Sequence, residues 1–165
     1  MQPAKLHRRA FVADLHCDSA LRMRDGHNMG QLLTSGHVDF TRLDSGGIDL
    51  EVFACWLPTE TPLDSCCAAT ELLLDSLTGQ CERNRDRVAI VHTAAETERA
   101  VAEGKLAVFI GIENGVAIAN DLASLRHFYD RGVRYMTLTH TASTDWCISS
   151  ADTAPACPGL TAFGR

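Results

Sequence analysis

Side chains of the types that bind metal ions follow apolar runs in this sequence. His16 and Asp18 come directly after the apolar run at 10–15, which predicts a short buried strand. On extended backbone, side chains two residues apart leave the same face, while Cys17 between them points the other way. An imidazole and a carboxylate placed in this way can share one metal ion, and both suit zinc. The alternative is that Asp18 caps a helix and His16 packs beside it.

Two further candidates follow later runs. Glu113 follows the apolar run at 105–112, where an ionised carboxylate needs a partner or a metal unless it lies in an exposed loop. His140 follows the run at 133–139 and is either a functional residue or a core histidine with a satisfied hydrogen bond. The carboxyl ends of parallel strands meet at one edge of an α/β fold, so all four side chains can meet there.

The elements that must position these side chains alternate along the chain. Patterns predict strands at 10–15, 50–57, 105–112 and 133–139, and helices at 65–83, 93–104 and 121–131. Ser65 is the expected N-cap of the first helix. Thr93 and Glu96 fit a capping box, and Gly104 suits the end of that helix. In the last helix, one face is expected to pack against the sheet: Leu122, Leu125, Phe128 and Tyr129.

This alternation predicts an α/β architecture with parallel strands and right-handed crossovers. We expect a single domain over residues 1–165, because the length suits one core and no linker or repeat interrupts it. Four strands are compatible with an open sheet, and they are also half of an eight-stranded barrel.

Composition excludes several classes of function. The net charge is −6, from 15 Lys and Arg against 21 Asp and Glu, with no basic stripe, so nucleic acid is not an expected partner. No apolar run reaches the length of a membrane span, and no signal peptide is visible, so we expect a cytoplasmic protein without a membrane partner. Seven cysteines without C-x-x-C spacing indicate neither a disulfide framework nor a zinc finger, and fit a reducing compartment.

Five motifs in order resemble the membrane (renal) dipeptidase family, peptidase family M19. The motifs cover nearly the whole chain: Val12-Ala13-Asp14-Leu15-His16-Cys17-Asp18, Gly46-Gly47-Ile48-Asp49-Leu50-Glu51-Val52-Phe53-Ala54, Ile110-Gly111-Ile112-Glu113-Asn114-Gly115, Gly132-Val133-Arg134-Tyr135-Met136-Thr137-Leu138-Thr139-His140 and Gly159-Leu160-Thr161-Ala162-Phe163-Gly164-Arg165. The resemblance implies the N-terminal half of a metal-dependent (β/α)8 TIM barrel.

The resemblance also implies a function for each candidate. The family hydrolyses dipeptides at a two-zinc centre, where a metal-bridging hydroxide attacks the peptide bond. His16 and Asp18 would ligate one zinc, Glu113 would bridge both, and His140 would stabilise the developing oxyanion over the substrate. The implied catalytic residues are thus His140 and Glu113, and the implied metal ligands are His16, Asp18 and Glu113.

Two departures from the family pattern change the expectation for this chain. Ile148 stands before Ser149-Ser150, where the family has an acidic residue. The histidines of the second zinc, an arginine and a late aspartate lie beyond the Gly159–Arg165 motif in the family. We therefore expect one zinc or none in these 165 residues, no activity from them alone, and either a second copy of the chain or a separate C-terminal half as partner.

Two other functions remain open from the sequence. One is a non-catalytic α/β fragment or binding module, in which the candidate ligands only form hydrogen bonds. The other is a related amidohydrolase that acts on another small amide.

Overall fold

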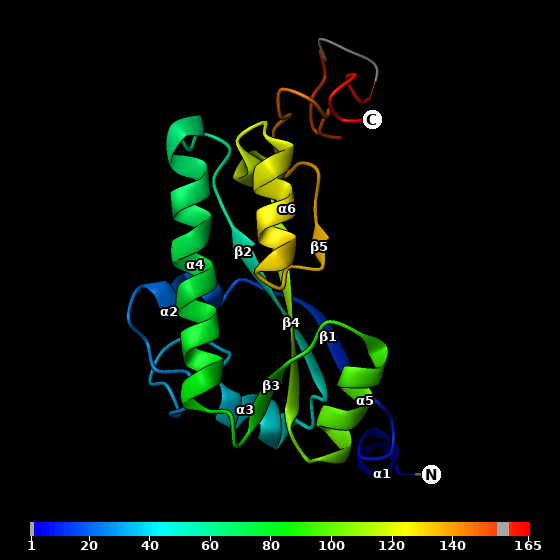
Figure 1. Ribbon diagram of the computed structural model, residues 1–165. Coiled ribbons are helices and arrows are strands. Elements are labelled where there is room, and N and C mark those ends of the chain that lie inside the picture. Colours follow the sequence, from blue (N-terminus) through cyan, green and yellow to red (C-terminus); the bar gives the residue numbers. More distant parts are fainter. Residues whose placement is uncertain (1, 155–158) are drawn as a thin grey trace.

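The strands form one sheet in the computed structural model, which describes residues 2–154 and 159–165 (Figure 1). The strands are β1 (Ala13–Cys17), β2 (Leu50–Trp56), β3 (Val88–Ile90), β4 (Leu106–Glu113) and β5 (Tyr135–Met136). They run in the order β1-β2-β4-β3, β5 also pairs with β4, and every pair is parallel. The predicted α/β class with parallel strands is confirmed.

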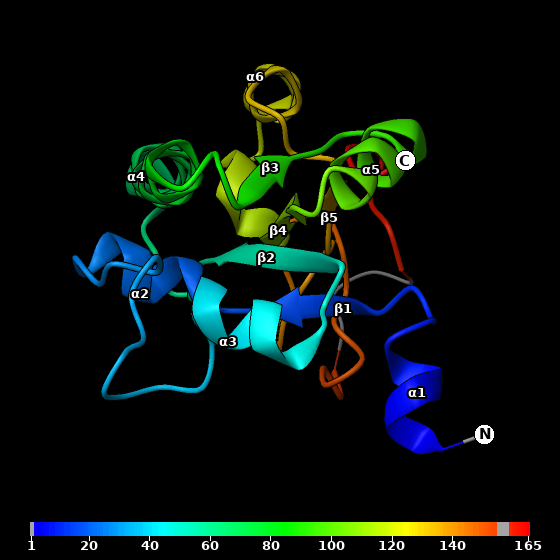
Figure 2. The same cartoon turned by 90° about the horizontal axis from the view of Figure 1, so that it is seen from below.

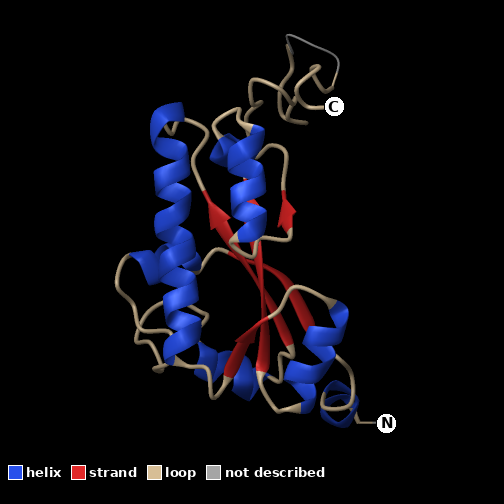
Figure 3. Cartoon of the chain, viewed as in Figure 1, coloured by secondary structure: helices blue, strands red, loops and turns tan. Residues whose placement is uncertain are grey.

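Helices connect the strands and flank the sheet (Figure 3). They are α1 (Pro3–His7), α2 (Ala20–Arg24), α3 (Phe40–Gly46), α4 (Leu63–Arg83), α5 (Ala94–Ala102) and α6 (Leu122–Asp130), with a 3-10 turn η1 at Gly115–Ile118. The three helices that the sequence predicts are all present. The short β3, the helices α1 to α3 and η1 are additional to the prediction.

Several predicted boundaries are wrong for local reasons. The first strand starts at Ala13 and includes His16, because Val12 is held by Asp49 just before β2 begins. The last strand is only Tyr135–Met136 instead of 133–139, because β4, its pairing partner, ends at Glu113. Ser65 lies inside α4, whose N-cap is Pro62.

The cap of α5 differs in detail from a full capping box. Thr93 accepts from the backbone N–H of Glu96 as predicted, but the Glu96 carboxylate accepts from the N–H of His92. Gly104, just after the helix, has a left-handed φ of +74° and suits the predicted end.

The strand order explains why helices cover both faces of the sheet. The chain moves away from β2 along α4 to reach β3, and then moves back along α5 to β4. Right-handed crossovers in opposite directions place their helices on opposite faces. Seen from below, α4 and α5 indeed flank the sheet on opposite sides (Figure 2).

Each face has its own packing. Leu73, Leu74 and Leu77 of α4 join the main core with alternate residues of β2 and β4, including Phe53 and Ile110. On the other face, a small cluster joins Ala100 of α5 to Ala107 of β4, with Leu50 and Phe109 packed against it. We call this second face, which also carries Trp56 and Glu113, the inner face.

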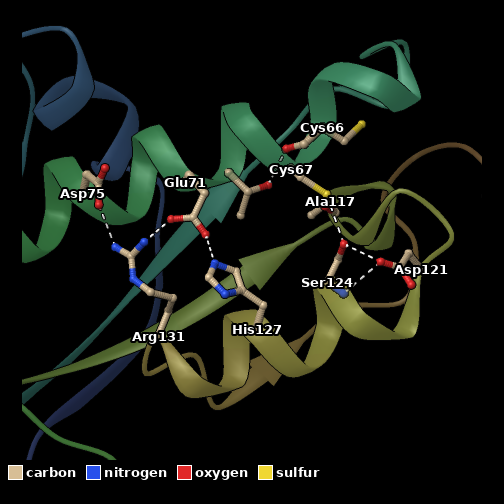
Figure 4. A network of polar contacts seen from close by, with 10 residues as sticks. Cys66, Cys67, Glu71, Asp75, Ala117, Asp121, Ser124, His127 and Arg131 are labelled. Atoms are coloured by element: carbon tan, nitrogen blue, oxygen red, sulfur yellow. Dashed lines mark hydrogen bonds and ion pairs between the residues drawn. The ribbon is translucent and has the colours of Figure 1, made fainter.

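The helix α6 packs less of its apolar surface than predicted. Phe128 is buried, but Leu122, Leu125 and Tyr129 are 59%, 39% and 51% exposed. Polar contacts hold α6 to α4 instead (Figure 4). Glu71 of α4 accepts from His127 of α6, at 2.6 Å, and from Arg131, the residue after α6, while Arg131 also donates to Asp75 at 2.7 Å.

Removing the shared carboxylate tests this helix contact. We expect Glu71→Gln to lower the free energy of unfolding by about 0.5–1 kcal/mol, because the pairs are partly exposed and partly screened. The loss should shrink at high salt in urea denaturation experiments. The control Glu82→Gln removes an exposed pair between the last turn of α4 and Arg85 just after it, and we expect a smaller change. Equal losses in the two variants would contradict a clamp between α4 and α6.

Candidate metal centre

The candidate ligands meet at the carboxyl ends of β1 and β4. A bulge in β1 brings this about: Ala13 and Asp14 pair with Leu50 and Glu51, but the next pair is Cys17 with Phe53, so β1 carries one extra residue. Cys17 therefore faces the main core, where it is buried. His16 and Asp18 lie on the inner side, as predicted from their spacing around Cys17.

Three of the four predicted side chains form one cluster. The His16 Nε2 atom lies 3.3 Å from Asp18 Oδ1 and 3.3 Å from Glu113 Oε2. One ligand atom from each of the three residues lies within 4.8 Å of the other two. Glu113 is the least exposed of them, with 16% of its side chain accessible, so it is not an exposed loop residue.

His140 lies at the edge of this cluster. Its Nε2 atom is 3.6 Å from Glu113 Oε1. Its ring meets the indole of Trp56 edge to face, with centroids 5.7 Å apart. Ser149 donates to the His140 carbonyl at 2.9 Å, which ties the following loop to this position. His140 is thus partly exposed beside Glu113 and is not a core histidine.

Asn114 fixes the backbone directly after Glu113. It has a left-handed φ of 83° and is fully buried. Its side-chain amide donates to the Leu57 carbonyl and to Thr59 Oγ1, both at 2.9 Å, and its N–H donates to Thr137 Oγ1 at 2.8 Å. These bonds join the ends of β2, β4 and β5 around the cluster.

The sequence reasoning missed two aromatic residues of the site. Trp56 pairs in register with Glu113 on the inner face, and its Nε1 is buried without a hydrogen-bond partner among the described residues. Tyr135 pairs with Gly111, two residues before Glu113. Trp56 could have been found from the sequence, because it stands at the end of β2 as Glu113 stands at the end of β4. Tyr135 could not, because only the pairing of β5 with β4 places it.

The chemistry of the donor set fits a divalent metal ion. One imidazole and two carboxylates are ligands that suit zinc. Four of the other histidines have partners away from the cluster: His7 bonds the Gly46 carbonyl, His27 the Arg22 carbonyl, His92 Glu96 and His127 Glu71. Within residues 2–154 and 159–165, the structure groups three possible metal ligands only at His16, Asp18 and Glu113.

Solved structures of dipeptidases share this fold. A metallo peptidase of family M19, the dipeptidase AC, superposes with a TM-score of 0.80 at 25% identity, over 93% of this chain and 51% of that one. The probable dipeptidase PvdM from Pseudomonas aeruginosa gives a TM-score of 0.82 at 21% identity, over 98% of this chain and 44% of that one. M19 dipeptidases have a TIM-barrel fold, so the prediction of a partial barrel is confirmed.

Curated relatives and a family profile agree with the structures. Dipeptidase 3 of Rattus norvegicus and that of Mus musculus are each 30% identical over 136 residues, which are 80% of this chain and 27% of the relative. The chain thus spans about a quarter of the length of these relatives. No helix among the described residues is long and apolar enough to cross a membrane. The profile of the membrane dipeptidases matches residues 1–165. The chain therefore belongs to the membrane dipeptidase family, peptidase family M19.

Proposed function

We propose that this chain contributes one side of the two-zinc centre of a dipeptidase. The observation that carries the proposal is the convergence of His16, Asp18 and Glu113, whose ligand atoms come within 4.8 Å of one another from two different strands. His16 and Asp18 would hold one zinc, and Glu113, with one oxygen toward His16 and the other toward His140, would bridge to the second.

The roles of the neighbouring residues follow from their positions. Zinc, when bound, would supply a metal-bridging hydroxide at neutral pH and polarise the scissile carbonyl. His140 would donate a hydrogen bond to the oxygen on which negative charge develops. The edge-to-face contact with Trp56 orients the His140 ring, and Trp56 Nε1, which has no hydrogen-bond partner in the described part of the chain, is a further donor on that indole. The proposed catalytic residues are therefore Glu113 and His140.

A dipeptide is the proposed substrate. A metallo peptidase from Rhodobacter sphaeroides was solved with a phosphinate mimic of the dipeptide L-Ala-D-Ala, and it superposes with a TM-score of 0.80 at 23% identity over 93% of this chain. The family membership supports the same class of substrate for this chain. The cytoplasmic location remains a prediction.

The remaining ligands are proposed to come from a polypeptide outside these residues, a separate C-terminal half or a second copy. Phe11, just before β1, and Leu15, in the middle of β1, are 57% and 67% exposed. Further protein that continues the sheet beside β1 would cover such apolar side chains. For the 165 residues alone we propose one bound zinc and no hydrolysis.

The test is a dipeptidase assay with and without a complementing half. The purified chain is incubated with zinc and L-Ala-D-Ala, alone and together with the C-terminal half of the Rhodobacter sphaeroides enzyme. We expect no alanine release from the chain alone and zinc-dependent release from the pair. The same pair assembled with His140→Asn should bind zinc but release alanine about 10²–10³-fold more slowly, as loss of an oxyanion donor predicts.

The alternatives give different outcomes in this assay. A pair that assembles and binds zinc but hydrolyses no dipeptide contradicts the proposal. Hydrolysis of other small amides by that pair would then indicate a related amidohydrolase. A chain that stays folded and binds no zinc between pH 6 and 8 would indicate a non-catalytic module.

A further inference from the structure

The residue after Glu113 has a backbone conformation that residues other than glycine rarely adopt. Asn114 combines a φ of 83° with a ψ of 111°, outside the regions that an L-residue occupies without steric strain. Such a conformation costs free energy and persists only where the surrounding structure holds it. In this chain the strained residue directly follows the last residue of β4, whose side chain is the candidate bridging ligand.

The side chain of Asn114 is held on two sides. Its amide nitrogen donates to the Leu57 carbonyl and to Thr59 Oγ1, both at 2.9 Å, and its Oδ1 accepts from the Val116 N–H at 3.4 Å. The residue is fully buried, so losing the amide would leave these groups without a partner. A carboxylate of the same size could not donate to either oxygen. The amide thus ties the end of β4 to the segment that follows β2.

The backbone of Asn114 and Gly115 contacts the segment that leads to His140. The Asn114 N–H donates to Thr137 Oγ1 at 2.8 Å. One residue further on, a Cβ atom on Gly115 would lie 2.5 Å from the Leu138 carbonyl oxygen, so glycine is what allows the two segments to come so close. The contacts at Thr137 and Leu138 lie three and two residues before His140.

These contacts place two functional side chains relative to each other. Glu113 directly precedes Asn114, and its Oε1 atom lies 3.6 Å from His140 Nε2. A side chain at the end of a strand keeps its direction when the backbone is held on both sides of it. The ladder of β4 holds the backbone before Glu113, and the bonds of Asn114 hold it afterwards.

We propose that Asn114 is a positioning residue of the metal centre: its bonds to the residues that follow β2 and β5 hold the direction of the Glu113 side chain and its distance from His140. This inference rests on the proposed function. Asn114 acts on the metal through Glu113 and is not itself a ligand. Hydrogen-bonded partners that orient metal ligands in this way are a general feature of metal sites.

Cobalt binding to the 165-residue chain tests the proposal, because the visible absorption of Co²⁺ reports both affinity and ligand geometry. Asn114→Gly tolerates the same φ without strain and removes the side-chain bonds. We expect it to weaken Co²⁺ binding by about 10-fold, as is typical for partners of metal ligands, and to shift the absorption bands. Wild-type affinity and spectrum in the folded variant would overturn the inference.

A milder variant keeps the test decisive if Asn114→Gly does not fold. Thr59→Val removes one acceptor of the Asn114 amide at a partly exposed position. It should weaken Co²⁺ binding in the same direction, by less than Asn114→Gly. If only Thr59→Val folds, wild-type Co²⁺ affinity and spectrum in this variant would overturn the inference.

Asn120 provides a matched control. It too is an asparagine with a positive φ, of 58°, and its side chain donates to Asp145 at 2.6 Å. It lies just before α6 and is not part of the cluster of candidate ligands. Asn120→Gly should leave Co²⁺ affinity and spectrum unchanged. Equal losses in Asn120→Gly and Asn114→Gly would show a general loosening of the chain and would overturn the inference.

A second measurement needs no metal and reports on His140. The rings of Trp56 and His140 lie with their centroids 5.7 Å apart, so their protons should give nuclear Overhauser contacts. Thr137→Val removes the acceptor of the Asn114 N–H and should weaken these contacts, whereas Asn120→Gly should leave them in place. Unchanged contacts in Thr137→Val overturn the inference. If they weaken but the wild-type chain binds no Co²⁺, Asn114 positions the side chains and the proposed zinc function is what fails.

Discussion

Replacing Glu113 by glutamine is expected to abolish zinc binding by this chain. The substitution keeps the size and shape of the side chain but removes the negative charge that faces His16 at 3.3 Å and His140 at 3.6 Å. Removing a direct ligand should lower zinc affinity by more than the roughly 10–100-fold that substitutions of residues around the ligands usually cause. Zinc affinity measured by competition with a chromophoric chelator gives the effect directly.

The control for this variant changes an equivalent group elsewhere. Glu82→Gln removes a carboxylate that is 70% exposed on α4 and pairs with Arg85. We expect it to bind zinc like the wild type, and circular dichroism should show that both variants are folded. Wild-type zinc affinity in a folded Glu113→Gln chain would exclude Glu113 as a ligand and, with it, the bridging role.

The stability of the chain is expected to fall as the pH rises from about 5 to 8, because of Glu51. This residue of β2 is fully buried, and both of its carboxylate oxygens lack a partner among the described residues. Burial, and then the nearby Asp14 carboxylate, raise the pKa of Glu51 from 4.5 to about 8. The folded chain therefore retains a proton that the unfolded chain loses above pH 4.5.

The sign and size of the effect follow from proton linkage. Where the unfolded state binds fewer protons than the folded state, the free energy of unfolding falls with pH, by at most about 1.4 kcal/mol per pH unit for one group. The free energy of unfolding should stop falling above about pH 8, the pKa of Glu51 in the folded chain. After allowance for relaxation and water entry around the carboxylate, we expect a total loss of about 2–3 kcal/mol between pH 5 and pH 8.5.

The variant Glu51→Gln isolates this contribution, because an amide does not ionise. It should unfold in urea with nearly the same midpoint at pH 5 and pH 8.5, and should be more stable than the wild type at the higher pH. The control Glu60→Gln, at an exposed turn position, should follow the wild-type profile. Parallel pH profiles for Glu51→Gln and the wild type would show that Glu51 is not the group responsible.

The convergence of the candidate ligands could be predicted from the sequence because these residues lie at or just after strand ends. The spacing of His16 and Asp18 around Cys17 requires only the alternation of a strand, and the structure places both on the inner side. Glu113 and His140 each follow an apolar run, and the convergence of parallel strands brings them together. Local pattern and a general rule of α/β folds are enough for these four residues.

Features that depend on long-range pairing are not visible in the sequence. The strand β3 is only three residues long, and its position beyond β4 is what sends α5 to the inner face. The bulge in β1 depends on its register with β2, and the approach of Tyr135 to Gly111 depends on β5. The apolar residues of α6 suggest full packing against a sheet, but Leu122 and Tyr129 are exposed because the described strands offer them no surface.

The most direct test of the account is the position of zinc in a crystal of the 165-residue chain grown or soaked with zinc. An anomalous difference map at the zinc absorption edge should show a peak about 2.0–2.2 Å from His16 Nε2 and from carboxylate oxygens of Asp18 and Glu113. A peak there, lost in crystals of Glu113→Gln, is the result that we predict. Zinc bound elsewhere, with the cluster of His16, Asp18 and Glu113 ordered and open to solvent, would contradict the proposed metal centre.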